Sequence, residues 1–183
     1  MISSNAQQTI NKMVERAIHA SPMVAGDGAR TVEVGTALER VTSDQVVVLT
    51  VSSYDFRLTF LIHFSDDEAT RAHFASANRV ADGTWDEQAF IDAIRECGNI
   101  SCGNLNRDLV RFFPHVGMST PNIISRRCAE HLNKLEPDYT QHFGLLDSAG
   151  PAFAVTVCVK AFIALDFSGD FEDAEATGEL EMF

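Results

Sequence analysis

The chain has 183 residues, 45% of them hydrophobic, which suits one well-buried domain and is too short for two full ones. Its formal net charge is −12, and no basic run is longer than Arg126-Arg127, so nucleic acid and anionic membranes are poor partners. No apolar run approaches the ~20 residues that span a bilayer. The first five residues lack the charged and apolar parts of a signal peptide, so we expect a cytoplasmic protein.

The first third of the chain predicts one helix followed by three strands. Residues 3–20 form an amphipathic helix whose buried face holds Ala6, Ile10, Met13 and Ala17. Strands are expected over residues 32–38, 46–51 and 56–64, the last with a clean alternation of Phe, Leu and Ile against other residues. Because their connections are too short for crossovers, we expect the three strands to form an antiparallel meander.

A short helix should open at the Ser65-x-x-Glu68 capping box and reach about residue 78. Beyond a long helix expected over residues 84–113, residues 126–135 predict a helix with Cys128, Leu132 and Leu135 turned inward, and Pro137 ends it. Strands follow over 142–146 and 152–167. Six acidic residues and no basic one lie between Asp170 and Glu181, which is typical of a solvated tail. The expected organisation is therefore one domain, 1–169, and an acidic tail, 170–183.

The longest element expected is a helix from Thr84 to Phe113. Thr84 and Glu87 make a T-x-x-E capping box, and Pro114 sets the far end. At about 100° per residue, one side of this helix should be buried, and it holds Phe90, Ile94, Cys97, Ser101, Leu105 and Phe112.

The opposite side of the same helix carries Asp92, Glu96, Asn99 and Gly103, within an arc of roughly 60°. Two carboxylates and a carboxamide thus share an outward face. Glycine inside a helix costs roughly 0.5–1 kcal/mol relative to Ala. Because Gly98 and Gly103 nevertheless flank Asn99, we expect another surface to come close there.

This pattern resembles a known family. Asp92-x-x-x-Glu96-x-x-Asn99, followed after a gap by Pro121, is similar to the signature of the CheC/CheX/FliY chemotaxis phosphatases. The run from Glu96 through Gly98, Asn99 and Gly103 to Asn104 is similar to the E-x-G-N-x-x-x-G-N of the CheX branch, and Ser119-Thr120-Pro121 to its S-T-P. Four fixed positions match by chance on the order of once in a few hundred chains of this length.

The resemblance implies a CheX-like α+β fold, in which a mostly antiparallel sheet carries long helices packed on one face. It also implies a homodimer. We expect one site per chain, as in the CheX branch, because the N-terminal helix has Ile18 where a second motif would need Asn. The implied activity is hydrolysis of the aspartyl-phosphate on a CheY-like receiver domain of a response regulator. Asn99 would then position the attacking water, and Glu96 would engage the receiver's lysine.

The other matching residues, Asp92, Gly98, Gly103, Asn104 and Pro121, would support this site. We expect no metal or cofactor of its own, with Mg²⁺ held by the receiver. Phosphoryl transfer from an acyl phosphate has a good leaving group, so an oriented water is the main requirement. A neutral carboxamide meets it without ionising. A non-catalytic module that binds receivers, as a sink or scaffold, is the alternative function.

Other chemistries find little support in the sequence. The four cysteines, Cys97, Cys102, Cys128 and Cys158, have no CxxC pairing and no histidines at ligand spacing, so we expect buried thiols rather than zinc ligands or disulfides. Cys102 lies nearer the helix flank and should be a little more reactive. An enzyme of another class is the weakest hypothesis, because the chain has no H-E-x-x-H, G-x-S-x-G, Walker or Rossmann pattern.

Overall fold

The structure, a computed structural model, describes residues 1–24, 31–34, 41–77, 86–146 and 153–169. Within these ranges the helices are α1 (Ser4–His19), α2 (Glu68–Ala77), α3 (Glu87–Leu109) and a kinked 3₁₀ helix, η2 (Arg126–Leu135). The strands are β1 (Thr31–Val34), β2 (Gln45–Ser52), β3 (Phe56–Phe64), β4 (Gly117–Met118), β5 (Asn122–Ser125), β6 (Tyr139–Leu146) and β7 (Phe153–Ala161).

All seven of these strands form one antiparallel sheet in the order β1-β6-β7-β3-β2-β4, and β5 pairs with β2 along the edge that β4 also uses. The α+β prediction with a mostly antiparallel sheet is therefore confirmed. The predicted three-strand meander is wrong: β2 and β3 form a hairpin, but β1 pairs with β6 at the far edge. Both edges of β2 are already occupied, one by β3 and the other by β4 and β5, so β1 has no place beside it.

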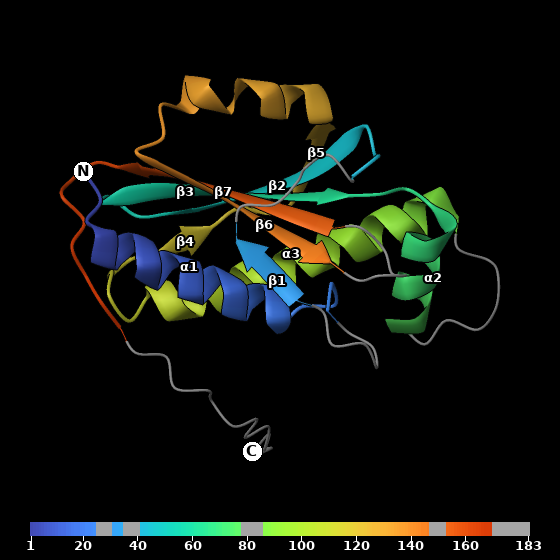
Figure 1. The fold of residues 1–183 in the computed structure, drawn as a ribbon, viewed down its shortest axis with the longest axis horizontal. Coiled ribbons are helices and arrows are strands. Elements are labelled where there is room, and N and C mark those ends of the chain that lie inside the picture. Colours follow the sequence, from blue (N-terminus) through green and yellow to red (C-terminus); the bar gives the residue numbers. More distant parts are fainter. Residues whose placement is uncertain (25–30, 35–40, 78–85, 147–152, 170–183) are drawn as a thin grey trace, which may run out of the picture.

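The helices divide between the two faces of the sheet, with α1 and α3 against one face and η2 against the other (Figure 1). The face under α1 and α3 holds the main core, since alternate residues of β3 point into it. These are Phe56, Leu58, Phe60, Ile62 and Phe64, each 2% exposed or less. The predicted inner face of α1 is confirmed, because Ala6, Ile10, Met13 and Ala17 are all buried.

Both predicted capping boxes differ from the structure. Asp86, one residue before α3, accepts a hydrogen bond from the Ala89 N–H at 2.7 Å and caps that helix, while Thr84 lies outside the described residues. Asp67 serves α2 in the same way, since its Oδ1 accepts from the Thr70 N–H at 2.8 Å. Ser65 is buried and its hydroxyl accepts from the Thr42 N–H instead. A carboxylate directly before a helix competes well for the free N–H groups of the first turn.

Two elements also end earlier than the sequence predicts. α3 ends at Leu109 rather than Phe113, because the chain turns there and buries Phe113 edge-on against Phe56, with ring centroids 4.9 Å apart. β7 ends at Ala161, and Phe162 and Ile163 beyond it are 55% and 50% exposed. In both cases the apolar pattern runs past the last residue with regular backbone.

The prediction that the thiols are buried is confirmed for Cys97, Cys102 and Cys158 and is wrong for Cys128, which is exposed on η2. Burial raises the pKa of Cys97 to about 12 and raises the pKa of Cys102 further. The expectation that Cys102 is more reactive is therefore wrong, because thiolate is the reactive form and burial disfavours it. No helix in the described ranges is long and apolar enough to cross a membrane.

The sheet face under η2 carries a histidine pair, of which His63 is buried and His142 is half-buried. His63 Nε2 and His142 Nδ1 both hydrogen-bond with Thr156 Oγ1, at 3.1 and 2.9 Å. His63 is 2% exposed. Its pKa is lowered to about 4, mainly because burial disfavours the charged ring and also because Arg126 and His142 lie close. Burial lowers the pKa of His142 as well.

This pair makes stability depend on pH. A histidine with pKa about 4 in the folded state and about 6.5 in the unfolded state stabilises the fold fully above pH 6.5, and that stability is lost as the pH falls toward 4. Urea unfolding should therefore show a loss of about 2 kcal/mol between pH 7.5 and pH 5. His63→Gln should flatten this dependence and exposed His19→Gln should not; equal slopes for both variants and the wild type would contradict the assignment.

Candidate functional site

Helix α3 approaches the sheet closely because position 98 is glycine. Gly98 is buried, and a Cβ built there would lie 2.9 Å from Leu49 Cδ1 and 3.4 Å from Val47 Cγ1, both side chains of β2. The expectation that a surface comes close to this glycine is met by the chain's own sheet. Gly98 therefore sets the distance of α3 from the sheet and is not part of an outward surface.

Gly103 has the opposite environment. A Cβ built there would have no atom within 4 Å, so nothing within the described part of the chain requires glycine at this position for packing. It lies on the same side of α3 as Asn99, four residues further along. The helix surface beside Asn99 is thus open.

Glu96 and Asn99 lie one helical turn apart and touch each other. Glu96 is exposed and Asn99 is half-buried. The Asn99 Nδ2 donates a hydrogen bond to Glu96 Oε2 at 3.2 Å. This bond uses one of the two N–H groups of the amide, and the amide oxygen Oδ1 can accept a hydrogen bond from a further group.

The segment Ser119–Pro121 lies between β4 and β5, at the edge of the sheet. Ser119 fixes it to β2: its Oγ accepts from the Thr50 N–H at 3.0 Å, and its own N–H donates to the Thr50 carbonyl at 2.9 Å. Thr50 follows Leu49, the residue that Gly98 faces, and α3 also packs against β4. Around the helix, Asn99 lies about 180° from Asp108, whose carboxylate lies 3.7 Å from Arg16 of α1, so Asn99 is on the side of α3 away from α1. The fold thus packs α3 against β2 and β4, the strand that precedes the S-T-P segment.

Asp92 and Asn104 occupy different positions relative to the pair. Asp92 is exposed on the same side of α3, where Gln88 Nε2 donates to its Oδ1 at 2.8 Å and Arg95 Nη1 lies 3.2 Å from that oxygen. These two partners engage its carboxylate within the helix. Asn104 lies about 140° around the helix from Asn99, and Arg107 donates to its Oδ1. Asp92 therefore shares the face of the pair, whereas Asn104 lies away from it.

Sequence reasoning named Ser119 only as part of a matching tripeptide and did not identify it as the anchor of the segment. A small hydroxyl residue before a Pro-containing turn gives a weak signal, because many such residues bond only within their own turn. The partner here, Thr50, is 69 residues away in the sequence.

The site contains no thiolate and no metal cluster. Cys97 and Cys102, on the buried side of α3, are kept protonated by burial, which raises both pKa values. No group of three or more His, Cys, Asp or Glu residues in the described ranges could hold a metal ion. What the edge offers is a carboxamide oxygen, an exposed carboxylate and an open helix surface.

No protein-family model matches the chain, and no curated protein matches its sequence. Solved structures match its fold. A chain of the CheX–CheY–BeF3–Mg²⁺ complex from Borrelia burgdorferi aligns with a TM-score of 0.60 at 13% identity, over 84% of this chain and 97% of that one. The chemotaxis protein CheX from Desulfovibrio desulfuricans aligns with a TM-score of 0.60 at 14% identity, over 82% and 99%.

A CheC-like superfamily protein from Shewanella sp. PV-4 aligns with a TM-score of 0.58 at 10% identity, over 87% of this chain and 99% of that one. Each alignment covers nearly the whole of the solved chain. The chain therefore has the fold of CheX and CheC-like chemotaxis proteins. This agrees with the resemblance carried by Glu96, Asn99 and Pro121 in the sequence.

Proposed function

We propose that the protein is a phosphatase of the CheX type, which removes the phosphoryl group from the aspartyl-phosphate of a CheY-like receiver domain. The observation that carries the proposal is the placement of Asn99. It stands on an open helix face, with its amide nitrogen held by Glu96 and its amide oxygen available. The fold supports the proposal, because the CheX chain of similar fold comes from a complex with CheY.

Catalysis in this proposal consists of positioning. An acyl phosphate needs a water held in line with phosphorus, and phosphoryl transfer passes through a loose transition state. The Asn99 Oδ1 accepts a hydrogen bond from that water. The water oxygen then attacks phosphorus as the bond from phosphorus to the aspartate oxygen breaks. The water's proton passes to the phosphate or the released carboxylate. A carboxamide supplies orientation without needing a proton of its own.

Glu96 has a separate role in docking. A carboxylate facing the phosphoryl group would be repelled by it, whereas a carboxylate facing the receiver's lysine makes a charge-assisted hydrogen bond. Glu96 is exposed, and its one hydrogen bond in the described structure is to Asn99. Mg²⁺ belongs to the receiver in this proposal, and this chain contributes no ligand to it. The protein acts in the cytoplasm, where receivers are.

The test is phosphate decay in a radiolabelled receiver from the same genome, with and without the protein. Catalytic amounts should shorten the lifetime of the phosphoryl group, while a small phosphate ester should remain intact because the site has no nucleophile of its own. Binding of a beryllofluoride-trapped receiver with an unchanged phosphate lifetime would overturn the phosphatase proposal in favour of a non-catalytic binding module.

We also propose that the working unit is a homodimer, as the resemblance implies. An antiparallel sheet with unpaired edge groups is a ready surface for a second copy. Light scattering should give twice the mass of one chain in the micromolar range. The mass of a single chain throughout that range would remove the dimer and leave the catalytic proposal intact.

A further inference from the structure

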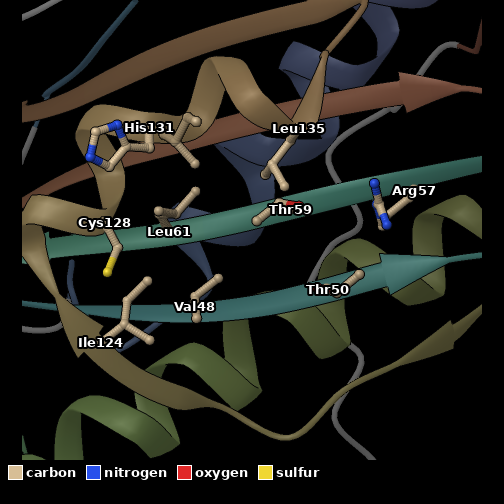
Figure 2. Close-up of a pocket in the computed structure, with 10 residues that line it drawn as sticks. Val48, Thr50, Arg57, Thr59, Leu61, Ile124, Cys128, His131 and Leu135 are labelled. Atoms are coloured by element: carbon tan, nitrogen blue, oxygen red, sulfur yellow. The ribbon is translucent and has the colours of Figure 1, made fainter.

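The helix η2 stands away from the sheet it covers. Its sequence is strongly two-sided, yet none of its residues is buried. Between η2 and strands β2 and β3 lies a groove with a volume of about 320 Å³, which we call the η2 groove (Figure 2). This volume falls within the roughly 300–1,000 Å³ typical of small-molecule pockets.

Apolar side chains from four elements form the walls of the η2 groove. Val48, Leu61 and Ile124 come from β2, β3 and β5 of the sheet, and Leu135 comes from η2 (Figure 2). Leu132 of η2 lines the groove as well. Leu135 is 37% exposed. An apolar groove left open to water is unfavourable unless something covers it, because apolar surface in contact with water costs free energy in proportion to its area.

One end of the groove is polar and positive. Arg57 lies there on β3, with the hydroxyl residues Thr50 and Thr59 beside it, whereas Cys128 and Ile124 lie at the other end (Figure 2). Arg57 has no acidic partner among the described residues.

The carboxylates closest in register to Arg57 are engaged elsewhere. Arg57 lies opposite Lys160 on β7. The ammonium group of Lys160 lies 3.8 Å from Asp138 Oδ2 and 4.0 Å from Glu136 Oε2. Asp138 Oδ2 also accepts a hydrogen bond from the Ala161 N–H at 2.9 Å. Among the described residues, these carboxylates therefore do not neutralise Arg57.

From these observations we infer that the η2 groove binds a free, straight-chain aliphatic carboxylate, with the carboxylate at Arg57 and the alkyl chain between η2 and the sheet. The guanidinium offers paired donors that match the two oxygens of a carboxylate. From Arg57 to Leu61 along β3 is about 13 Å at the usual rise of a strand. That length suits an extended medium-chain fatty acid. The unpaired cation, the apolar walls and the shape of the groove agree on this one class of ligand.

Cys128 gives a direct readout, because it lines the groove and is the exposed thiol, whereas Cys97, Cys102 and Cys158 are buried. In the full-length protein, iodoacetamide should modify Cys128 first. Decanoate should slow this modification in a saturable way. Affinity measured by the same protection should rise about fourfold for each methylene from hexanoate to decanoate, as burial of alkyl surface requires.

Two matched variants test the role of the charge. Arg57→Gln should weaken decanoate binding about tenfold, through loss of the charge-assisted pair. Arg127→Gln, an exposed arginine of η2 that does not line the groove, should leave the affinity unchanged. The uncharged decanol should bind more weakly than decanoate.

Three results would overturn the inference. One is an unchanged rate of Cys128 modification at every decanoate concentration below micelle formation. The second is equal affinity for decanol and decanoate. The third is an equal loss of affinity in Arg57→Gln and Arg127→Gln, which would indicate attraction to general positive charge. None of these outcomes depends on the phosphatase proposal, because the assay contains no receiver.

Discussion

Asn99→Ala is expected to slow dephosphorylation of the receiver by on the order of 10²–10³-fold, the usual loss when one preorganised polar group is removed from a reacting centre. The variant should still bind a beryllofluoride-trapped receiver with nearly the wild-type affinity, because one small amide contributes little to a whole interface. Asn99 lies on an open surface and its Nδ2 bonds only to Glu96 in the described structure, so the fold should survive. Phosphate decay and affinity are measured side by side.

Glu96→Ala separates the two roles, since it should weaken docking rather than the chemical step, through loss of a charge-assisted contact to the receiver's lysine. It also removes the acceptor that holds the Asn99 amide, so the activity of Glu96→Ala at saturating receiver should fall. The fall should be smaller than in Asn99→Ala, because the Asn99 amide itself is still present. Asp92→Ala, on the same face but engaged by Gln88 and Arg95, is the matched control and should do much less than either. Full activity in Asn99→Ala would assign water positioning to another residue.

The second large effect is expected from Gly98→Val. The first added carbon would lie 2.9 Å from Leu49 Cδ1 and 3.6 Å from Ile62 Cδ1, and valine adds two methyl groups beyond it, so the Leu49 side chain, α3 or the sheet must shift to accept it. Overpacking of this kind destabilises by about 1–3 kcal/mol. Because Asn99 is the next residue, displacement of α3 should also lower receiver dephosphorylation by on the order of tenfold to a hundredfold. Urea unfolding and phosphate decay measure the two effects.

Gly103→Ala is the control for this substitution. It changes a glycine of the same helix, but the new Cβ meets no atom within 4 Å. The protein should gain about 0.5–1 kcal/mol of stability, because alanine loses less conformational freedom than glycine in a helix. If Gly98→Val and Gly103→Ala changed the free energy of unfolding by similar amounts, close packing of α3 on β2 would not explain the glycine at position 98.

The parts of the fold that the sequence predicts well are those where a single element carries its own pattern. The buried face of α1, the alternation along β3 and the hairpin of β2 with β3 follow from local spacing and short connections. The pairing of β1 with β6 could not be predicted in this way. It depends on which strand edges the rest of the chain leaves free, and that is a property of the whole sheet.

In the candidate site, too, local spacing predicts some features and misses those that depend on the folded sheet. Spacing alone placed Glu96 and Asn99 on one helix face, and the structure has them in contact. Spacing also placed the two glycines near Asn99 but could not distinguish their environments, because only the folded sheet puts Leu49 against Gly98 and leaves Gly103 open. The bond from Ser119 to Thr50 joins residues far apart in the chain, so no local pattern announces it. The exposure of Cys128 was not predicted for the same reason, because local spacing does not show that η2 stands away from the sheet.

The buried thiols of α3 give the site helix a built-in reporter of its own opening. Cys97 and Cys102 flank Asn99 at two and three residues' distance, and both are fully enclosed. A thiol reagent can reach them only when α3 detaches from the sheet, so their labelling rate equals the rate for a free thiol multiplied by the population of that open state. With Cys128 and Cys158 replaced by serine, the slow labelling that remains reports the opening of α3. A docked receiver, which needs the closed helix, should lower the labelling rate of Cys97 and Cys102 by about the ratio of the receiver concentration to its dissociation constant.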